Sequence, residues 1–488
     1  MAEDITPIIT GSALAAMAPG AVRKLWETGV HVAEQEEDFF QQMESTSKTG
    51  IIVAKSDTSK GKGQKITFTN MSGFYDEPHI GDARFDGPED FEEINISSYD
   101  LDVDWLRHAY SKNDRAEEVM GMRGEILNGA NVELGKWLGR QKSEQMFGIF
   151  QLKLNSANVF YASGKTLDTL TSADTLTWDE IVTGGQAMKP LGGLPANVSR
   201  AGGMPIWSQT VIPTEAALTS LKLDPDYKTV LQNAGVRGEQ NTLFNGGYPD
   251  IDGHTIVPYN PIDHDGIGSV GSFLNPKAFL GVAVTAGTTT FDVKGGGNAT
   301  DAAKTKKKYF KFFPNYAYEF LGAGVITPAS GTRYFLIYNV SGADAGKAGM
   351  YSYTTGNDGN KITIVNRLGS AASGARVTTL GGVTWNTGVW SGKHTDAHPI
   401  GSLIIPCNSL GVPIGDTLML GRMAAFRGYG KYRGMRSQQE LEGGFIQQNY
   451  ITSVFGQKLR EDRLGRHPGV IRITHAISYP GVNLPVVS

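Results

Sequence analysis

The sequence has one cysteine, Cys407, among 488 residues. A single thiol cannot form an intrachain disulfide, and it cannot supply a zinc site built from several cysteines. The chain is therefore expected to fold without such cross-links, either in a reducing compartment or because its core needs no added support.

Long apolar runs are missing as well. No stretch approaches the roughly 18 consecutive apolar residues of a membrane-spanning helix. The first residues, MAEDITPII, are acidic and are interrupted by Pro7, which does not fit a signal peptide. We therefore expect no membrane partner. Glycosylation requires secretion, so little weight falls on the acceptor motifs at Asn95, Asn197, Asn298 and Asn339.

Charge is sparse and nearly balanced. Charged residues make up 19% of the chain, and the formal net charge is −4, which gives no general tendency to bind nucleic acid. Glycine is abundant, with 62 residues, as in turn-rich globular proteins that favour β structure. The length allows two or three domains, each with a substantial core.

The N-terminal part predicts an irregular arm over residues 1–18, followed by a helix from Pro19 to about Met43. Proline suits the first turn of a helix because its missing amide donor is not needed there. Apolar residues then recur at helical spacing: Val22, Leu25, Trp26 and Ala33. The polar face of this helix is acidic, with Glu34, Glu36, Glu37 and Asp38.

A long two-stranded excursion is predicted next. Residues 51–54 and 65–69 are expected to be strands, with a polar, mobile loop over 56–63. Residues 72–90 contain three glycines and two prolines and predict an exposed tip, after which residues 94–105 lead back. Isolated hairpins are marginally stable in water, so we expect this one to lie on a neighbouring subunit.

One long helix is predicted from Asp114 to Phe150. Asp114 and Glu117 have the spacing of a capping box. A helix of this length spans on the order of 50 Å. The apolar stripe comprises Val119, Met122, Ile126, Ala130, Leu134, Trp137 and Leu138. Glycines inside a helix each cost about 1 kcal/mol relative to alanine, and they indicate close backbone packing or bending here; they are Gly121, Gly124, Gly129, Gly135 and Gly139.

The rest of the chain contains a region with both helix and strand patterns, which is interrupted by a region with strand patterns alone. Helices are predicted over residues 178–188 and 214–221, and strands over 210–212, 254–257 and 279–284. From Thr285 to Pro399 the sequence is rich in Gly, Thr, Ser and Asn, and it predicts an inserted, sandwich-like all-β domain. Its strands are expected at 334–338, 361–365 and 376–380, with a hairpin turn at 357–359. The interrupted α/β domain resumes at 403–420, and the clearest closing strand is 470–474.

Two segments resemble nucleotide-binding motifs without their context. Gly266-Ile-Gly-Ser-Val-Gly271 has the letters of a dinucleotide fingerprint, but no strand precedes it and Asn275-Pro276 blocks the following helix. We interpret it as a flexible loop. Gly164-Lys165-Thr166 has Val159 where a phosphate-binding loop needs glycine. In addition, no Ser, His and Asp stand in a context diagnostic of a hydrolase.

Other polar clusters are interpreted as surface or turn residues. The spacing of Asp250, Asp252, His254, Asp263, His264 and Asp265 fits neither a calcium loop nor a zinc protease motif. His394 and His398 are expected at the surface. A basic run with neighbouring aromatics could contact phosphate, but we favour a solvated domain boundary for it: Lys304, Lys306, Lys307, Lys308 and Lys311. We therefore predict no catalytic, cofactor-binding or metal-binding residues.

Three segments together carry a family resemblance. The first is Trp105-Leu-Arg-His-Ala-Tyr110 with the long helix through Trp137 and Phe147. The second runs from Arg237-Gly238 through Phe244-Asn-Gly-Gly247 to Pro258, and the third combines Phe426-Arg-Gly-Tyr-Gly430 with Gly469-Val-Ile-Arg-Ile-Thr474. In this order they resemble the major capsid proteins of tailed bacteriophages, in the N-four-like podophage branch of the Hong-Kong-type capsid fold. The resemblance covers most of the chain outside residues 285–399.

The resemblance implies an α+β capsid fold with an inserted all-β domain whose role is left open. Its segments would be residues 1–50 (N-terminal arm and helix), 51–110 (extended-loop hairpin and peripheral strands), 111–152 (spine helix), 153–284 (axial α/β domain), 285–399 (inserted β-rich domain), 400–444 (axial return) and 445–488 (C-terminal peripheral strands). Members of the family have no enzymatic activity and no cofactor.

Family members form icosahedral shells from hexamers and pentamers of one chain. The resemblance therefore implies that the chain itself is the main partner, with scaffold, portal and decoration proteins as further candidates. Packaged DNA would be enclosed without sequence-specific binding. The protein would be part of the virion and would assemble in the cytoplasm of a bacterial host.

Two other functions stay open at this point. The chain could be a β-rich surface protein that recognises a host glycan through residues 285–399, or a hydrolase whose site is not recognised. Particle formation on expression separates the capsid from the binding protein, and a turnover screen with pocket mutants addresses the hydrolase.

Overall fold

The computed structural model describes much of the chain, with gaps. The described residues are 34, 37–57, 59–71, 96–113, 125–152, 154–194, 197–201, 204–233, 250–251, 253–259, 279–280, 290–292, 310–311, 332–339, 343, 347–354, 361–368, 379–380, 383–384, 395, 397–399, 402–408, 412–431, 435–441, 446–462 and 465–477. The chain divides into two compact units. Unit 1 comprises Met1–Thr46, Ile52–Lys142 and Ala425–Arg460, and unit 2 comprises Ser47–Ile51, Ser143–Ala424 and Glu461–Ser488.

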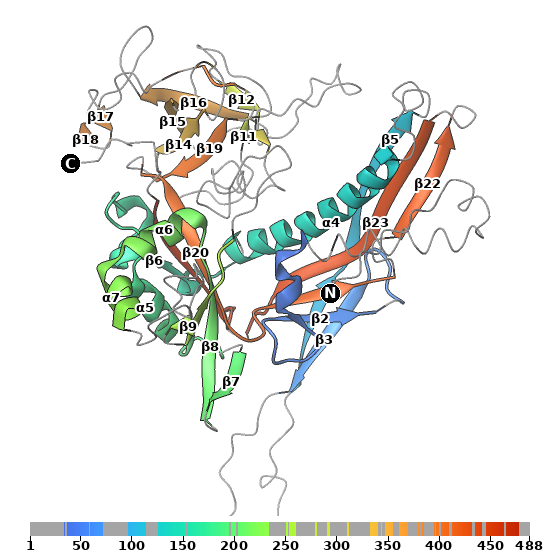
Figure 1. Cartoon of the computed structure of the whole chain (residues 1–488), viewed down its shortest axis with the longest axis horizontal. Helices are drawn as coiled ribbons and strands as arrows, with labels where there is room; N and C mark the ends of the chain where they lie inside the picture. The colour runs from blue at the N-terminus through green and yellow to red at the C-terminus, as the bar shows by residue number, and fades with distance from the viewer. Residues whose placement is uncertain are drawn as a thin grey trace, which may run out of the picture. The chain divides into compact units, whose positions relative to one another are not determined.

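Unit 1 is built on a sheet whose strands come from distant parts of the sequence (Figure 1). Its order is β1 (Glu44–Ser45), β2 (Ile52–Ser56), β21 (Ala425–Tyr429), β23 (Ile446–Leu459) and β22 (Met435–Leu441). β5 (Asp104–Asn113) also pairs with β23, in antiparallel register from Asp104 opposite Phe455 to Asn113 opposite Ile446. β2 runs parallel to β21, so the N-terminal segment is tied directly to the C-terminal part of the chain.

The predicted hairpin is present at its base and packs on one face of this sheet. β3 (Lys65–Met71) pairs with β4 (Ile96–Asp102). The rings of Phe68 and Tyr99 lie 4.7 and 5.3 Å from the ring of Phe426 in β21. A Cβ added at Gly428 would come within 2.7 Å of Leu101, so the sheet and hairpin are in close contact. The base therefore lies on the chain's own sheet instead of on a neighbour, and the predicted tip lies outside the described residues.

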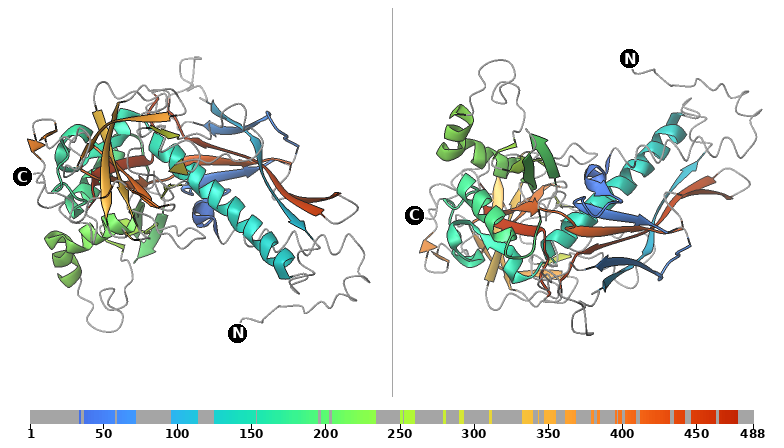
Figure 2. Two further views of the ribbon diagram at one scale, coloured as in Figure 1. Left: turned by 90° about the horizontal axis from the view of Figure 1, so that it is seen from above. Right: turned by 90° about the horizontal axis from the view of Figure 1, so that it is seen from below.

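The other face of the sheet carries α4 (Glu125–Leu152), a helix about 42 Å long at 1.5 Å per residue. Figure 2 shows it as one continuous helix. Leu134 and Leu138 form an apolar cluster with Ile451 of β23, joined by Leu106 and Tyr110 of β5. The segment with the predicted cap, Asp114 and Glu117, lies outside the described residues.

The predicted N-terminal helix is described only at its end. Residues 34 and 37 are helical, and the chain then forms a 3-10 helix, η1 (Phe39–Met43). Asp38 caps η1 by accepting a hydrogen bond from the amide of Phe40 at 3.2 Å. The expected arm, residues 1–18, lies outside the described part of the chain.

Unit 2 contains a mixed sheet flanked by helices. The strand order is β6 (Val159–Tyr161), β24 (Val470–Ala476), β20 (Ile414–Leu420), β8 (Met204–Ile212), β10 (His254–Ile256) and β9 (Asp250–Ile251), and β7 (Asn197–Ala201) pairs with β8. β20 is antiparallel to both of its neighbours, whereas β10 is parallel to β8 and β6 is parallel to β24. Short 3-10 helices, η3 (Ser156–Asn158), η4 (Ala162–Gly164) and η5 (Leu167–Thr169), surround β6.

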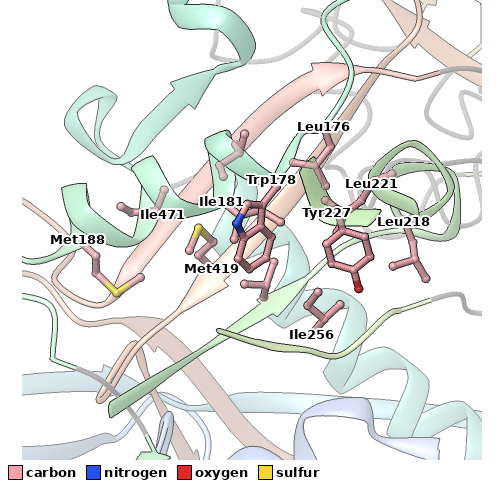
Figure 3. Packing of buried hydrophobic residues seen from close by; sticks show 13 residues of the cluster. Leu176, Trp178, Ile181, Met188, Leu218, Leu221, Tyr227, Ile256, Met419 and Ile471 are labelled. Carbon is pink, nitrogen blue, oxygen red and sulfur yellow. The ribbon is translucent and has the colours of Figure 1, made fainter. Parts of the chain in front are cut away.

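The helices of unit 2 begin where their caps predict. Thr177 and Glu180 form a capping box ahead of α5 (Trp178–Met188), and the Thr214 hydroxyl accepts from the amide of Ala217 at the start of α6 (Glu215–Leu223). α7 (Pro225–Asn233) follows. α5 and α6 bury an apolar face against β20 and β24 (Figure 3): Trp178, Ile181, Leu218, Leu221, Met419 and Ile471 are among the residues of this core.

The β-rich region forms a sheet of its own within unit 2. Its order is β12 (Thr290–Asp292), β16 (Lys361–Leu368), β15 (Ala348–Thr354), β14 (Thr332–Tyr338), β19 (Leu403–Cys407), β11 (Phe279–Leu280) and β13 (Phe310–Lys311). β17 (Thr379–Leu380) and β18 (Val383–Thr384) form a separate pair. β15 and β16 pair as the two arms of the predicted hairpin, whose turn at 357–359 lies outside the described residues.

Several segment boundaries expected from the sequence differ from the limits that strand pairing indicates. β11 and β19 lie outside residues 285–399, yet β19 pairs with β14 along five positions, so this sheet extends beyond the compositional limits of the insertion. In the expected axial return, 400–444, β20 lies in the α/β sheet, but β21 and β22 belong to unit 1. The expected peripheral strands, 445–488, also divide, because β24 pairs with β20 and β6 in unit 2.

Among the helices that the structure describes, none combines the length and apolar character needed to cross a membrane.

Candidate assembly elements and a buried charge cluster

The segment Trp105–Tyr110, which carries the family resemblance, is part of strand β5. Its alternate residues point to opposite faces. Leu106 and Tyr110 pack with α4, and the ring of His108 stacks on Trp137 at 4.4 Å. Burial lowers the pKa of His108, which favours the neutral ring in this stack. On the other face, the Arg107 guanidinium lies 3.2 Å from the centre of the Trp105 ring, which is 40% exposed.

A group of buried charges lies on the α4 side of the unit 1 sheet. We call it the charge clasp and define it as Glu34, Asp38, Glu44, Lys142 and Arg427. Arg427 of β21 donates to Asp38 at 2.7 Å and also to Glu44. Lys142 of α4 donates to Glu34. The side chains of both cations are fully buried.

Neighbouring side chains complete the environment of the charge clasp. The Tyr429 hydroxyl donates to Glu44 at 2.7 Å, and the Lys142 ammonium lies 4.9 Å from the centre of the Tyr429 ring and 5.0 Å from that of Phe455. Burial on its own would lower the pKa of Arg427, but Asp38, Tyr429 and Glu44 outweigh it and raise that pKa. Burial lowers the pKa of Lys142 against the opposing effect of Glu34, and it raises the pKa of Tyr429.

The N-terminal segment lies directly against α4 at Gly139. A Cβ placed on Gly139 would come closer to the Glu34 carbonyl oxygen than real Cβ atoms approach, and it would lie 3.1 Å from the amide nitrogen of Asp38. One of the helix glycines is therefore explained by close backbone packing, which was one of the two alternatives that the sequence left open.

Several candidate residues from the sequence have structural roles. Lys165 forms an ion pair with Asp174 at 2.6 Å and does not belong to a phosphate loop. His398 was expected at the surface but is buried, with Nε2 2.6 Å from the Tyr351 hydroxyl and Nδ1 2.7 Å from Asn339 Oδ1. His254 is buried in β10 beside Trp178, with ring centres 6.0 Å apart. The aromatic and amide partners of these histidines were not adjacent in sequence, which is why the pattern did not reveal them.

The remaining candidates are placed only in part. Asp250 lies in β9, and Lys311 lies in β13. The described residues exclude Asp252, Asp263, His264, Asp265, His394, the Gly266–Gly271 motif and Lys304, Lys306, Lys307 and Lys308. Within the part of the chain that the structure describes, no three His, Cys, Asp or Glu side chains gather as a metal site would require.

The sequence did not predict the charge clasp. Its available signals were the acidic face of the N-terminal segment and an arginine, Arg427, within the apolar strand β21. Neither signal identifies a partner, since 389 positions separate Arg427 from Asp38. Chemically, the charge clasp pairs each cation with a carboxylate and presents no nucleophile, so the arrangement fastens chain segments together.

No protein-family model and no curated protein sequence matches the chain. Solved structures do match. The capsid of Ralstonia phage GP4 aligns with a TM-score of 0.51 at 12% identity, covering 91% of this chain and 93% of that one. The capsid asymmetric unit of Cyanophage Pam1 aligns with a TM-score of 0.51 at 10% identity, covering 90% and 92%.

The chain has the fold of a phage capsid subunit. This Hong-Kong-type capsid fold is a mixed α+β architecture, as the resemblance in the sequence implied. The likeness spans about nine-tenths of both chains. At 10–12% identity the likeness establishes the fold.

Proposed function

We propose that this chain is the major capsid protein of a tailed bacteriophage, and that its copies assemble into an icosahedral shell around a double-stranded DNA genome. The observation that carries the proposal is the extent of the structural likeness. About nine-tenths of this chain aligns with about nine-tenths of a phage capsid chain, so the shared part is a whole subunit.

The architecture of unit 1 supports an assembly role. The base of the β3–β4 hairpin is fixed by the contact of Phe68 and Tyr99 with Phe426. The tip predicted at residues 72–90 lies outside the described residues. The proposal assigns this tip to contacts with neighbouring copies, α4 to the spine, and the α/β sheet of unit 2 to the axial domain.

Finer assignments belong to the same proposal. We assign the chain to the N-four-like podophage branch on the basis of the segment Trp105–Tyr110 and the helix that follows. Subunits would form hexamers and pentamers, with scaffold, portal and decoration proteins as partners, and DNA would be enclosed without sequence-specific contacts. The protein would act without a cofactor and without enzymatic activity, in virions assembled in the bacterial cytoplasm.

Electron microscopy of the purified, full-length protein tests the proposal. Expression alone, and together with the other head genes of the source phage, is expected to yield closed shells of uniform diameter. A chain that stays monomeric in both cases, at concentrations where it remains folded by circular dichroism, would contradict an assembly function. Glycan binding or substrate turnover by such a monomer would then support the binding protein or the hydrolase.

We also propose that the β-rich insertion lies on the outer face of the shell. The basic run Lys304–Lys311 argues for the opposite face, since it could contact DNA. Protease treatment of intact, DNA-filled particles separates the two cases. Cleavage near Lys306–Lys308 without loss of DNA supports the outer face, and complete protection until the shell is broken places the insertion inside.

A further inference from the structure

The N-terminal segment of unit 1 is held by buried charges, by the buried Phe40 side chain and by the two-residue pairing of β1 with β2. In the described residues 34 and 37–45, the buried side chains are those of Glu34, Asp38 and Phe40, and the Glu44 side chain is 7% exposed. Three of these four groups are carboxylates. An apolar attachment would instead have placed several aliphatic side chains against α4 and β21, as Leu134 and Leu138 do in the cluster with Ile451.

The facing surface supplies the matching charges. From α4 come Lys142 and, at the rim, Arg140, which lies 3.5 Å from Glu37. From β21 come Arg427 and Tyr429, both in contact with Glu44. From β23 come uncharged groups: the Phe455 ring, and the Gln457 amide, which donates to the Lys142 carbonyl at 3.0 Å.

We propose that the charge clasp is an acid-opened fastening of the N-terminal segment. At neutral pH the carboxylates hold residues 34–45 on α4 and β21. When acid protonates Asp38, Glu44 and Glu34, the segment detaches together with its short β1–β2 pairing, while the other strands of the sheet and the hairpin stay folded.

The physical reason is the cost of a buried cation without a counterion. Arginine remains charged at any pH a protein experiences. A buried cation that loses its partner is strongly destabilising, whereas a cation reached by water is not. Arg427 lies in a paired strand and cannot leave, so the segment that carries the carboxylates is the part that moves. Protonation also weakens the Asp38 cap on the amide of Phe40.

The main contacts of the hairpin and of β23 do not depend on buried carboxylates, and the ion pair of Lys65 with Asp100 on the hairpin is solvent-exposed. The hairpin packs on β21 through aromatic and aliphatic side chains, and β23 is paired with β5, β21 and β22 by backbone hydrogen bonds. Neither kind of contact changes when carboxylates are protonated. The proposal therefore requires a selective loss of the segment before global unfolding.

Hydrogen exchange of the full-length chain, measured by mass spectrometry from pH 7 to pH 3 and corrected for the intrinsic exchange rate, tests this. When the pH is lowered from 7 to 3, peptides from residues 37–46 are expected to lose protection at least tenfold. Peptides from 446–459 and, in unit 2, from 178–188 should stay protected. Loss of protection in all of these peptides at the same pH would overturn the proposal.

Amino-acid substitutions test whether the attachment of the segment depends on its buried charges or on packing. The triple variant Asp38→Asn, Glu44→Gln, Arg427→Met removes the Arg427 part of the charge clasp and leaves the pair of Glu34 and Lys142, so its segment should show a reduced acid step. Asp104→Asn, which neutralises the exposed partner of Lys62 elsewhere in unit 1, is the control and should keep the wild-type step. If the triple variant does not fold, Asp38→Asn alone should weaken protection at pH 7 and reduce the step. An unchanged acid step in either clasp variant would contradict the proposal.

Discussion

At the scale of single residues, Gly139 and Arg427 show how unit 1 is joined on the α4 side of its sheet. Gly139 allows the backbone of the N-terminal segment to touch α4, and Arg427 gathers the carboxylates of that segment. Both residues act across large separations in sequence. Substituting either should therefore affect the attachment of the segment more than the secondary structure around the substituted position.

Gly139→Ala is expected to destabilise the protein by about 1–3 kcal/mol through overpacking. In a helix interior, alanine is normally more stable than glycine by about 1 kcal/mol. A fall in the free energy of unfolding would therefore indicate close packing at Gly139, whereas a rise would indicate helix propensity alone. Urea unfolding of the full-length chain measures it. Gly61→Ala is the control, because a Cβ there meets nothing within 4 Å. A stabilised Gly139→Ala variant would show that the segment yields easily at this contact.

Asp174 predicts a separate pH effect in unit 2. Burial would raise the pKa of Asp174, but hydrogen bonds from Lys165 and Thr171 outweigh it and lower that pKa to about 2. An unfolded aspartate has a pKa near 3.9. The stabilisation is therefore complete above about pH 4 and is lost as the pH falls toward 2.

Asp174→Asn should accordingly be less stable than wild type at pH 7 and should lose less of its stability between pH 5 and pH 2.5. Thermal unfolding followed by circular dichroism measures the difference. Asp179→Asn, an exposed carboxylate on the first turn of α5, is the control. If the stability of Asp174→Asn and that of the wild type change with pH in the same way, the ion pair with Lys165 contributes no net stability.

At the scale of elements, the β3–β4 hairpin divides into a base and a tip. The base contributes Ile66, Phe68 and Leu101 to the core of unit 1. Its outward side is polar, with an ion pair between Lys65 and Asp100 at 3.9 Å and a hydrogen bond from Thr67 to Asp100 at 2.8 Å. A base held this way should fold without its tip.

Deleting residues 73–88 is therefore expected to leave a folded, soluble chain that no longer closes shells. Electron microscopy reports the assembly, and thermal unfolding reports whether the subunit is intact. Phe68→Ala is the complementary variant: it disturbs the base and should lower stability by about 3–5 kcal/mol. Normal shells from the deletion would remove the tip from the assembly mechanism.

At the scale of the whole molecule, the composition and the fold place the limits of the β-rich insertion differently. Composition changes at Thr285 and Pro399, but the sheet also includes β11 and β19. Asn408, just after β19, belongs to the α/β part, because its side chain amide donates to the carbonyls of Leu167 and Leu170. The structural limits are thus Phe279 and Cys407.

Two excisions test these limits. Replacing residues 279–407 with a short Gly/Ser bridge should give a soluble chain that keeps the α/β sheet, because Phe279 is paired with Leu403, four residues before Cys407. Replacing only 286–398 leaves β11 and β19 without β14, and it should aggregate through the exposed edges. Size-exclusion chromatography and near-ultraviolet circular dichroism compare the two. Equal solubility would favour the compositional limits.

The sequence determined the local elements of this protein. Thr177 and Thr214 predicted the starts of α5 and α6, and alternating or β-branched runs predicted β3, β14 and β24. Helix caps and hydrophobic periodicity involve residues only a few positions apart, so they can be recognised without knowledge of the rest of the chain. Three segments in their order, among them Trp105–Tyr110 with the helix after it, indicated the capsid fold.

Only the tertiary structure decided which sheet each strand joins and which charges meet. β23 and β24 are consecutive and similar in sequence character, yet they lie in different units. The charge clasp joins residues 34–44 to Lys142 and Arg427, and His398 is buried by Tyr351 and Asn339. The physical reason is that strand pairing and ion pairing are contacts between distant segments, and a local pattern states what a residue can contact without stating its partner.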